Sequence, residues 1–355
     1  MNQSTRPPAG EPVPNVIDRI EGYYPELVAI RHDLHAHPEI GFEEVRTSTI
    51  VAEKLSSWGI EVHRGIGKTG VVGLLRGRHP GNRSLGLRAD MDALPMPEET
   101  GLAYASVHPG RFHGCGHDAH TTILLGAARY LAETRDFAGT VTFIFQPAEE
   151  GLGGARAMIA DGLFERFPVD EIYGLHNATQ LPPNHLHVSA GAVLAGADFF
   201  DVTFRGKGAH GAHPNVARDP IPAIAELVQA LQTIVSRNVP PTEPAVLSVT
   251  KIFGGSAYNV IPEIASVGGT VRAFSDDIRQ LIRERMTAIS HNIAAAYDIE
   301  AIVDIRDIFS VLTNHQDHVD IIADIGREVL GKDRVSTVPG RAMGSEDFAD
   351  MLLHA

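Results

Sequence analysis

Short runs of strand-forming residues alternate with helical stretches along the first half of this chain. Two helices are expected between residues 16 and 55, further helices at 121–134 and 154–159, and strands at 70–75, 84–89, 139–145 and 171–175. Strands that alternate with helices of this length favour an α/β fold, in which helices flank a central sheet on both faces. The first half of the chain therefore predicts an α/β domain.

The pattern changes near Gly191. Beyond it we expect the order strand, helix, strand, strand, helix, strand, at residues 198–204, 220–236, 245–253, 266–274, 278–296 and 300–308. This β-α-β-β-α-β order is typical of a small ferredoxin-like α+β domain. Two last helices, at 317–330 and 345–353, are expected to return to the first domain. The prediction is a discontinuous domain of residues 16–190 and 312–355, an inserted lid or dimerisation domain of residues 191–311, and a loose tail of residues 1–15.

Composition narrows the possible partners. The 30 Lys and Arg residues stand against 44 Asp and Glu in 355 residues, a formal charge of −14, which argues against nucleic-acid binding. No apolar run approaches the roughly 20 residues that cross a bilayer, so no membrane partner is expected. Cys115 is the only cysteine. An intrachain disulfide is therefore impossible, and a reducing, cytoplasmic setting is predicted.

Two segments carry residues suited to metal chemistry. In the segment from His113 to His120, Cys115 and His117 lie two apart on a glycine-flanked loop. Both can turn to one cation, and a thiolate and an imidazole are good ligands for Zn²⁺. Glu149 and Glu150 follow the strand predicted at 139–145. One carboxylate of such a pair can bind a metal while the other takes a proton from water.

Two more predicted strands end in similar residues. Asp90 and Asp92 follow residues 84–89, and His176 follows the strand at 171–175. In open α/β sheets, ligands bind outside the carboxyl ends of the strands. Each pattern alone also fits a common structural role: a loop thiol, a solvated acidic loop or a hydrogen-bonded histidine. Together they predict a metal site at one edge of the first sheet.

Nine motifs in order resemble one family. They run from about Ile30 to Phe348 and read RHDLHAHPEIGFEE, GLRADMDALP, HGCGHDAHT, FQPAEEG, GLHN, GKGAHGAHP, GGSAYNVIPE, GTVRAF and GSEDFA. Together they resemble the M20 metallopeptidase superfamily, and within it the branch of N-acyl-amino-acid, hippurate and auxin-conjugate hydrolases. This resemblance implies a metal-dependent amidohydrolase that releases a free amino acid from a small N-acyl-amino-acid substrate.

The resemblance also implies a site with two divalent metal ions, usually zinc and sometimes manganese, cobalt or nickel. Cys115 and His117 match two ligands of the family, and Glu150 and His176 match two more. Glu149 matches the general base. These assignments place the whole metal site in the first predicted domain.

Further roles implied by the resemblance fall mostly on the inserted domain. His210 matches a histidine that polarises the scissile carbonyl, often across a dimer interface, so a homodimer through the inserted domain is expected. Asn259 and Arg272 match residues that receive the free carboxylate of the substrate, and the planar fork of arginine suits that task. In the first domain, Asp92 stands where the wider superfamily has an acid beside a ligating histidine. That histidine is replaced here, so Asp92 is expected only to orient a ligand.

One departure from the family leaves alternatives open. Relatives continue past the GSEDFA motif and supply another histidine ligand, whereas this chain ends at Ala355. His354 comes too early to replace that ligand. The recorded chain is either shortened, or one metal position has a ligand fewer. Two alternatives accompany the amidohydrolase hypothesis: a non-catalytic homologue that uses the scaffold for binding, and a cysteine hydrolase with Cys115 as nucleophile.

Overall fold

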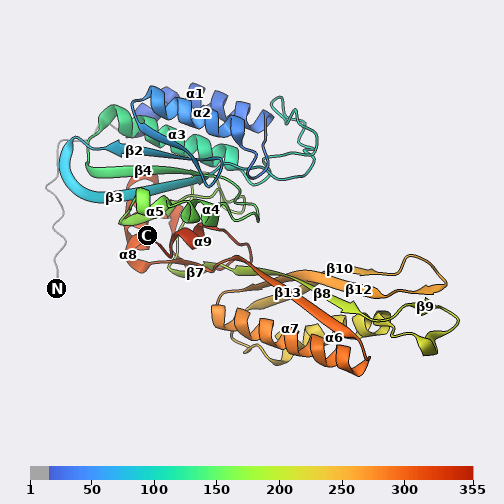
Figure 1. The fold of residues 1–355 in the computed structure, drawn as a ribbon. Helices are drawn as coiled ribbons and strands as arrows, with labels where there is room; N and C mark the ends of the chain where they lie inside the picture. Colours follow the sequence, from blue (N-terminus) through green and yellow to red (C-terminus); the bar gives the residue numbers. More distant parts are fainter. Residues whose placement is uncertain (1–15, 355) are drawn as a thin grey trace. The chain divides into compact units, whose positions relative to one another are not determined.

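The computed structural model describes residues 16–354 and divides the chain into two compact units (Figure 1). Of the described residues, the first unit comprises 16–178 and His354, and the second comprises Thr179–Leu353. The tail predicted at residues 1–15 lies outside the described residues. The second unit includes residues 312–353, whereas the sequence analysis assigns these residues to the first domain. That residues 191–311 form an inserted domain stays a prediction.

A five-stranded sheet forms the centre of the first unit. Its strands are β1 (Glu61–Ile66), β2 (Gly70–Arg76), β3 (His79–Asp90), β4 (Ala138–Gln146) and β5 (Glu171–Gly174), in the order β1-β2-β4-β3-β5. Strand β3 runs parallel to β4 and β5, while β2 is antiparallel to β4 and β1 antiparallel to β2. The parallel strands β3, β4 and β5 therefore end at the same edge of the sheet.

Helices flank this sheet. On one face lie α1 (Val16–Ala36), α2 (Val45–Ser57) and α3 (His117–Thr134), and on the other lie α4 (Gly154–Ala160) and the short α5 (Leu163–Arg166) (Figure 1). The centre of strand β4 is buried on both faces of the sheet: the consecutive residues Phe143, Ile144 and Phe145 are all fully buried. The α/β fold predicted for this region is confirmed.

The second unit is built on an antiparallel sheet. Its strands are β8 (Gly196–Arg205), β10 (Ala245–Gly254), β12 (Ile264–Ala273) and β13 (Glu300–Phe309), in the order β10-β12-β8-β13. Helices α6 (Pro220–Arg237) and α7 (Asp276–Ala296) cover one face of this sheet (Figure 1). The chain order of these elements is the predicted β-α-β-β-α-β order.

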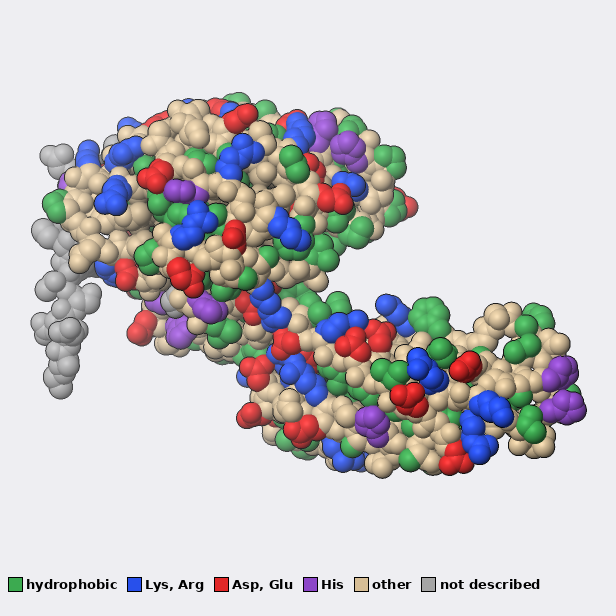
Figure 2. All heavy atoms as spheres, in the orientation of Figure 1, with side chains coloured by type: hydrophobic (Ala, Val, Ile, Leu, Met, Phe, Trp, Pro, Cys, Tyr) green, Lys and Arg blue, Asp and Glu red, His purple; other side chains and the backbone are tan. Residues whose placement is uncertain are grey.

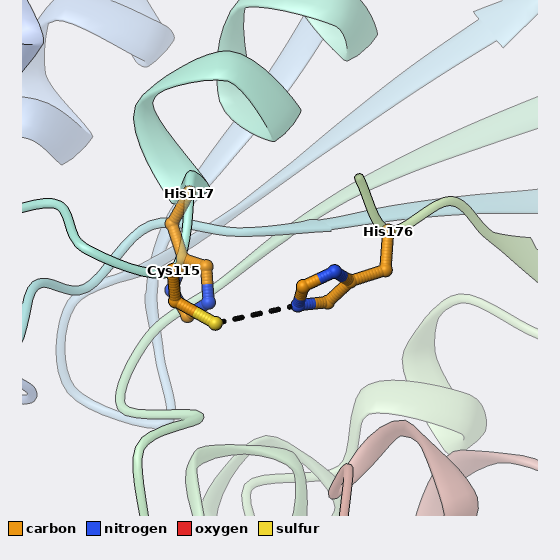
Figure 3. Close-up of side chains that lie close together, drawn as sticks. All are labelled: Cys115, His117 and His176. Carbon is orange, nitrogen blue, oxygen red and sulfur yellow. Dashed lines mark hydrogen bonds between the residues drawn. The ribbon is translucent and has the colours of Figure 1, made fainter. Parts of the chain in front are cut away.

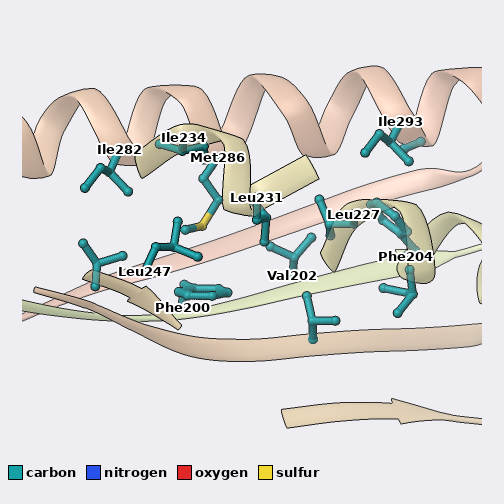
Figure 4. Packing of buried hydrophobic residues seen from close by; sticks show 14 of the residues in the cluster. Phe200, Val202, Phe204, Leu227, Leu231, Ile234, Leu247, Ile282, Met286 and Ile293 are labelled. Carbon is teal, nitrogen blue, oxygen red and sulfur yellow. The ribbon is translucent and has the colours of Figure 1, made fainter. Parts of the chain in front are cut away.

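Alternation along β8 explains which face the helices cover. Phe200, Val202 and Phe204 are buried and point toward the helices, while the residues between them are more exposed. They pack against Leu227, Leu231 and Ile234 of α6 and Ile282, Met286 and Ile293 of α7 (Figure 4). Because side chains alternate along a strand, Phe199 on β8 and Arg272 on β12 lie on the opposite face of the sheet.

Shorter elements complete the second unit. They are β6 (Leu186–His187), β7 (Gly191–Leu194), β9 (Ala209–His210), η1 (Pro214–Val216), β11 (Val260–Ile261), β14 (Leu312–Asn314), α8 (Gln316–Leu330), η2 (Lys332–Arg334), β15 (Val335–Ser336) and α9 (Phe348–Met351). Strand β6 pairs with β15, β7 with β14 and β9 with β11.

Several elements differ from the sequence prediction. Strand β1, which pairs with β2, was not predicted. Its exposed charged residues do not give the apolar pattern of a strand. Helix α3 begins at His117, four residues earlier than expected. The last helix is only α9, which begins at Phe348, where the Glu346 carboxylate accepts the backbone N–H of Phe348 at 3.0 Å. Among the described residues, no helix has both the length and the apolar character needed to span a membrane.

Candidate metal centre

The predicted ligands meet at the edge where β3, β4 and β5 end. Asp90 is the last residue of β3, and Asp92 follows it; Glu149 and Glu150 come soon after β4. His176 lies two residues beyond β5, and His117 is the first residue of α3. The structure therefore brings together the residues that the sequence placed on separate segments.

Cys115, His117 and His176 form one group at this edge (Figure 3). Ligand atoms of the three residues lie within 4.8 Å of one another, and Cys115 Sγ is 3.4 Å from His176 Nε2. The neighbouring imidazoles of His117 and His176 lower the pKa of the Cys115 thiol, and the hydrogen bond to Cys115 raises the pKa of His176 to about 9. A thiolate and two imidazoles suit zinc and related metals.

A second group shares His117. Its Nε2 atom lies 3.8 Å from Glu150 Oε1 and 4.0 Å from Glu149 Oε2. His117 Nε2 and Glu150 Oε1 are both buried, and neither has a hydrogen-bond partner within residues 16–354. A buried polar atom without a partner costs about 1–3 kcal/mol. A cation held between these atoms removes that cost, so the residues present fit a metal ion.

Asp92 connects the two halves of this site. One of its oxygens lies 3.2 Å from His117 Nδ1, and the other accepts the backbone N–H of Glu150 at 3.0 Å. The contact at Nδ1 favours the tautomer that leaves Nε2 of His117 open as a ligand atom. The orienting role of Asp92 itself stays a prediction.

A buried network that the sequence analysis missed lies beside the site. His120 Nδ1 is 2.6 Å from Asp90 Oδ1, and its Nε2 is 2.6 Å from Asn177 Oδ1. Arg88 donates to the other oxygen of Asp90 at 2.7 Å. A sequence signal existed, because His117 and His120 are three apart at the start of one helix and so share a face.

Asn177 connects His120 to His176 by contacts with both side chains. The backbone oxygen of Asn177 lies 2.7 Å from His176 Nδ1, which directs Nε2 toward Cys115. Gly116 makes room for the Asn177 side chain: a Cβ there would lie 2.5 Å from Asn177 Oδ1, and the φ of Gly116 is +93°. The Cys-Gly-His spacing thus requires its central glycine.

The predicted substrate residues lie in the second unit. His210 of β9 pairs with Val260 of β11, and the N–H of Gly211 donates to the oxygen of Asn259 at 2.7 Å. His210 and Asn259 are therefore neighbours, and both are exposed. Histidine and hydrophobic side chains gather at the end of the unit that carries β9 (Figure 2).

Arg272 lies apart from this pair, near the carboxyl end of β12. Its Nη1 atom donates to the hydroxyl of Thr270 and to the oxygen of Val271, and its guanidinium carbon lies 5.8 Å from the centre of the Phe199 ring. Its Nε and Nη2 atoms make no hydrogen bond to any residue the structure describes. Burial lowers the pKa of Arg272. One edge of the guanidinium is thus fixed and the other is open.

His354 belongs to neither group of possible ligands. Its ring stacks on Phe164 of α5 at a centroid distance of 6.1 Å, and it joins no metal-binding group among the described residues.

An α/β sheet whose carboxyl edge gathers a thiol, imidazoles and paired carboxylates has the arrangement of a metal-dependent hydrolase. A family model described as peptidase family M20/M25/M40 matches residues 86–355, and the chain belongs to this family. The family resemblance of the nine motifs is therefore confirmed.

Individual relatives agree with this class. The chain is 43% identical to a hippurate hydrolase of Campylobacter jejuni, over 94% of this chain and 87% of the relative. It is 40% identical to an N-acetyl-L-cysteine deacetylase of Bacillus subtilis, over 93% of this chain and 78% of the relative. A solved Bacillus subtilis structure, described as a dinuclear metal-binding peptidase of the M20 family, superimposes with a TM-score of 0.79 at 33% identity and covers 94% of this chain and 86% of that one.

These findings establish the class of the protein. It is a metal-dependent amidohydrolase that uses divalent metal ions. They favour this class over the two alternatives, a cysteine hydrolase and a non-catalytic binding protein.

Proposed function

We propose that this protein hydrolyses the amide bond of N-acyl-amino acids, such as hippurate or N-acetyl-amino acids, to a free amino acid and a carboxylic acid. The observation that carries this proposal is the Glu149–Glu150 pair beside His117. The 43% identity to a hippurate hydrolase supports the choice of substrate class. A single cysteine fits a reducing cytoplasm, where we propose that the reaction takes place.

Four side chains would hold two divalent ions: Cys115, His117, His176 and Glu150. The thiolate and imidazole donors favour zinc, while manganese, cobalt and nickel also accept such ligands. When bound, these ions lower the pKa of water and polarise the scissile carbonyl. Asp92 orients His117 and Glu150 through its two hydrogen-bonding contacts.

Glu149 is the general base in this proposal. Its side chain is buried beside His117, 4.0 Å from Nε2. It takes the proton from the attacking water and then delivers it to the leaving nitrogen. Glu150, next along the chain, carries the buried oxygen that lacks a partner within residues 16–354 and so serves as the ligand.

The free carboxylate of the substrate binds the open edge of Arg272. With Nη1 held by Thr270 and Val271, the Nε–Nη2 edge can form two parallel hydrogen bonds to a carboxylate. His210 stabilises the charge that develops on the carbonyl oxygen, and Asn259 assists carboxylate binding.

The spacing within the second unit supports a homodimer. Arg272 stands eight residues from Ile264 on β12, about 26 Å at the usual rise of a strand, and Asn259 lies beyond the Ile264 end. One chain therefore cannot bring Asn259 and Arg272 to the same carboxylate. We propose that His210 and Asn259 come from a second copy of this chain.

Exposed apolar residues provide a surface for that second copy. Ile252 and Phe253 near the end of edge strand β10 are 61% and 63% exposed, and Tyr258 in the loop after it is fully exposed. An edge strand with exposed apolar side chains is prone to pair with another chain.

Metal removal and a substrate panel test the proposed function. Incubation with a chelator should abolish hydrolysis of hippurate, N-acetyl-methionine and N-acetyl-diaminopimelate, and added Zn²⁺ or Mn²⁺ should restore it. Activity that survives complete metal removal, or no hydrolysis of any N-acyl-amino acid by the metal-loaded protein, would contradict the proposal.

A further inference from the structure

Glu44 is a buried acid outside the metal centre. It lies immediately before α2, and its side chain is fully buried. One carboxylate oxygen accepts the backbone N–H of Ala148 at 2.8 Å, and the other accepts the Thr69 hydroxyl at 2.5 Å. Within residues 16–354, no basic side chain forms an ion pair with it. The carboxylate is therefore held by two hydrogen bonds and by no opposite charge.

Its partner Ala148 has an unusual backbone. Ala148 is fully buried with φ +53°, in the left-handed region that residues with a Cβ rarely adopt. Its own oxygen accepts the N–H of Gly154 at 3.0 Å, which closes the turn that contains Glu149 and Glu150. The strained residue thus immediately precedes the two carboxylates of the proposed reaction.

Packing fixes this turn from two sides. A Cβ on Gly41 would lie 2.9 Å from both Cα and Cβ of Ala148, so the segment before α2 presses directly on the turn. A Cβ on Gly154 would lie 1.6 Å from the oxygen of Pro147. The turn has no room to relax while Glu44 and Gly41 remain in place.

We infer that Glu44 is a positioning residue for the reaction: by accepting the N–H of Ala148, it holds the left-handed turn that sets where Glu149 and Glu150 point. This inference rests on the proposed roles of Glu149 as base and Glu150 as ligand. Without the hydrogen bond, Ala148 would relax toward negative φ, and both carboxylates would move relative to His117.

Two substitutions of Glu44 and one control separate this role from general stability. Glu44→Ala should lower kcat by about 10–100-fold and weaken Zn²⁺ affinity by a similar factor, measured by competition with a chelator. KM should change by less than about threefold, because the proposed carboxylate contacts lie elsewhere. Glu44→Gln should stay within about fivefold of the parent protein, since its amide oxygen can accept from Ala148 while its nitrogen donates to Thr69. Thr69→Val, which removes only the other hydrogen bond, should leave kcat and metal affinity near normal.

A double variant tests whether Ala148 carries the effect. Glycine adopts positive φ without penalty, so Ala148→Gly should reduce the need for Glu44. We expect the loss caused by Glu44→Ala to be at least about threefold smaller in the Ala148→Gly background. If Glu44→Ala does not fold, as circular dichroism would show, Gly41→Ala displaces the same turn from the other side and should give the same joint loss of kcat and metal affinity.

The outcomes distinguish the two proposals. A folded Glu44→Ala variant with kcat and Zn²⁺ affinity within threefold of the parent, or a loss unchanged by Ala148→Gly, overturns the role of Glu44. Glu149→Gln is measured in parallel. If the metal-loaded parent protein hydrolyses no N-acyl-amino acid, the proposed function fails. If Glu149→Gln retains full turnover, Glu149 is not the base; if Glu149→Gln is inactive while Glu44→Ala is normal, only the positioning role fails.

Discussion

The two units of this protein hold their functional side chains in different ways. In the first unit, a hydrogen bond to another buried group fixes His117, Glu150 and the loop of His176. In the second unit, His210 and Asn259 are exposed on a short two-stranded ribbon, and Arg272 is held along one edge only. The contrast follows from chemistry: metal ligands must be oriented before the ion binds, whereas groups that meet a substrate must remain accessible.

The largest expected effects lie in the first unit, at the Glu149–Glu150 pair. Glu149→Gln should lower turnover roughly 10²–10⁴-fold, because a general base contributes that much, while metal content stays nearly intact. Glu150→Ala should lose metal. Metal analysis and steady-state kinetics on both variants provide the measurement. The reverse pattern of metal loss would show that the two roles are exchanged, and a loss below tenfold at Glu149 would remove it as the base.

Substitutions in the second unit should mainly weaken substrate binding. Arg272→Ala should lower kcat/KM for hippurate by about 10–100-fold, because a hydrogen-bonded charge contributes about 1.5–3 kcal/mol. Arg272→Lys should not restore it, since an ammonium group lacks the two-pronged edge. Amidation of the substrate carboxylate should raise KM for the parent protein but have little further effect on Arg272→Ala. Equal turnover of acid and amide by the parent protein would contradict carboxylate binding at Arg272.

Mixing two inactive variants tests whether both units act within one chain. Glu149→Gln disables the first unit and His210→Ala the second. If a site combines the first unit of one copy with His210 of another, mixed dimers contain one intact site, and activity should recover toward about a quarter of the parent level. Phe253→Glu on the edge of β10 should weaken the dimer, which sedimentation would detect. A fully active, concentration-independent monomer would contradict the dimer.

The sequence predicted the arrangement of the first unit better than its details. Ligands at the ends of separate strands were predictable, because the parallel strands β3, β4 and β5 must end at one edge. The hydrogen bond from Ala148 to Glu44 was not, since it joins residues 104 apart in the chain. The contact of His120 with Asn177 spans 57 residues. Such bonds depend on how helices pack on the sheet, which local patterns do not encode.

In the second unit, periodicity was sufficient for the core but not for the functional residues. The alternation along β8 and the helical spacing in α6 and α7 predicted the two packed layers (Figure 4). The β9–β11 ribbon, which places His210 beside Asn259, consists of two strands of two residues each. Strands so short have no detectable period, so the neighbourhood of these two residues emerged only from the structure.

The smallest expected effect concerns a buried pair that anchors α3 of the first unit. His35 Nδ1 lies 2.9 Å from Asp118, the residue after His117, and His35 Nε2 lies 3.3 Å from Glu98. The hydrogen bond to Asp118 is the main cause that raises the pKa of His35 above its usual 6.5, against the opposing effect of burial. The rings of Tyr104 and His113 also face His35, at centroid distances of 5.4 Å and 6.3 Å.

A raised histidine pKa fixes the direction in which the free energy of unfolding changes with pH. The stabilisation is fully present below the unfolded pKa of 6.5 and is lost as pH rises through the higher folded value. The free energy of unfolding of the parent protein should therefore fall, relative to His35→Gln, as the pH rises above 6.5. Urea unfolding of both proteins at matched metal content measures this difference, and the histidines common to both cancel. A difference that stays constant or grows with pH would mean that His35 is not charged in the folded protein. The contacts of His35 that hold α3 would then be neutral hydrogen bonds. The side chains of the first unit would in that case be held less firmly, as those of the second unit are.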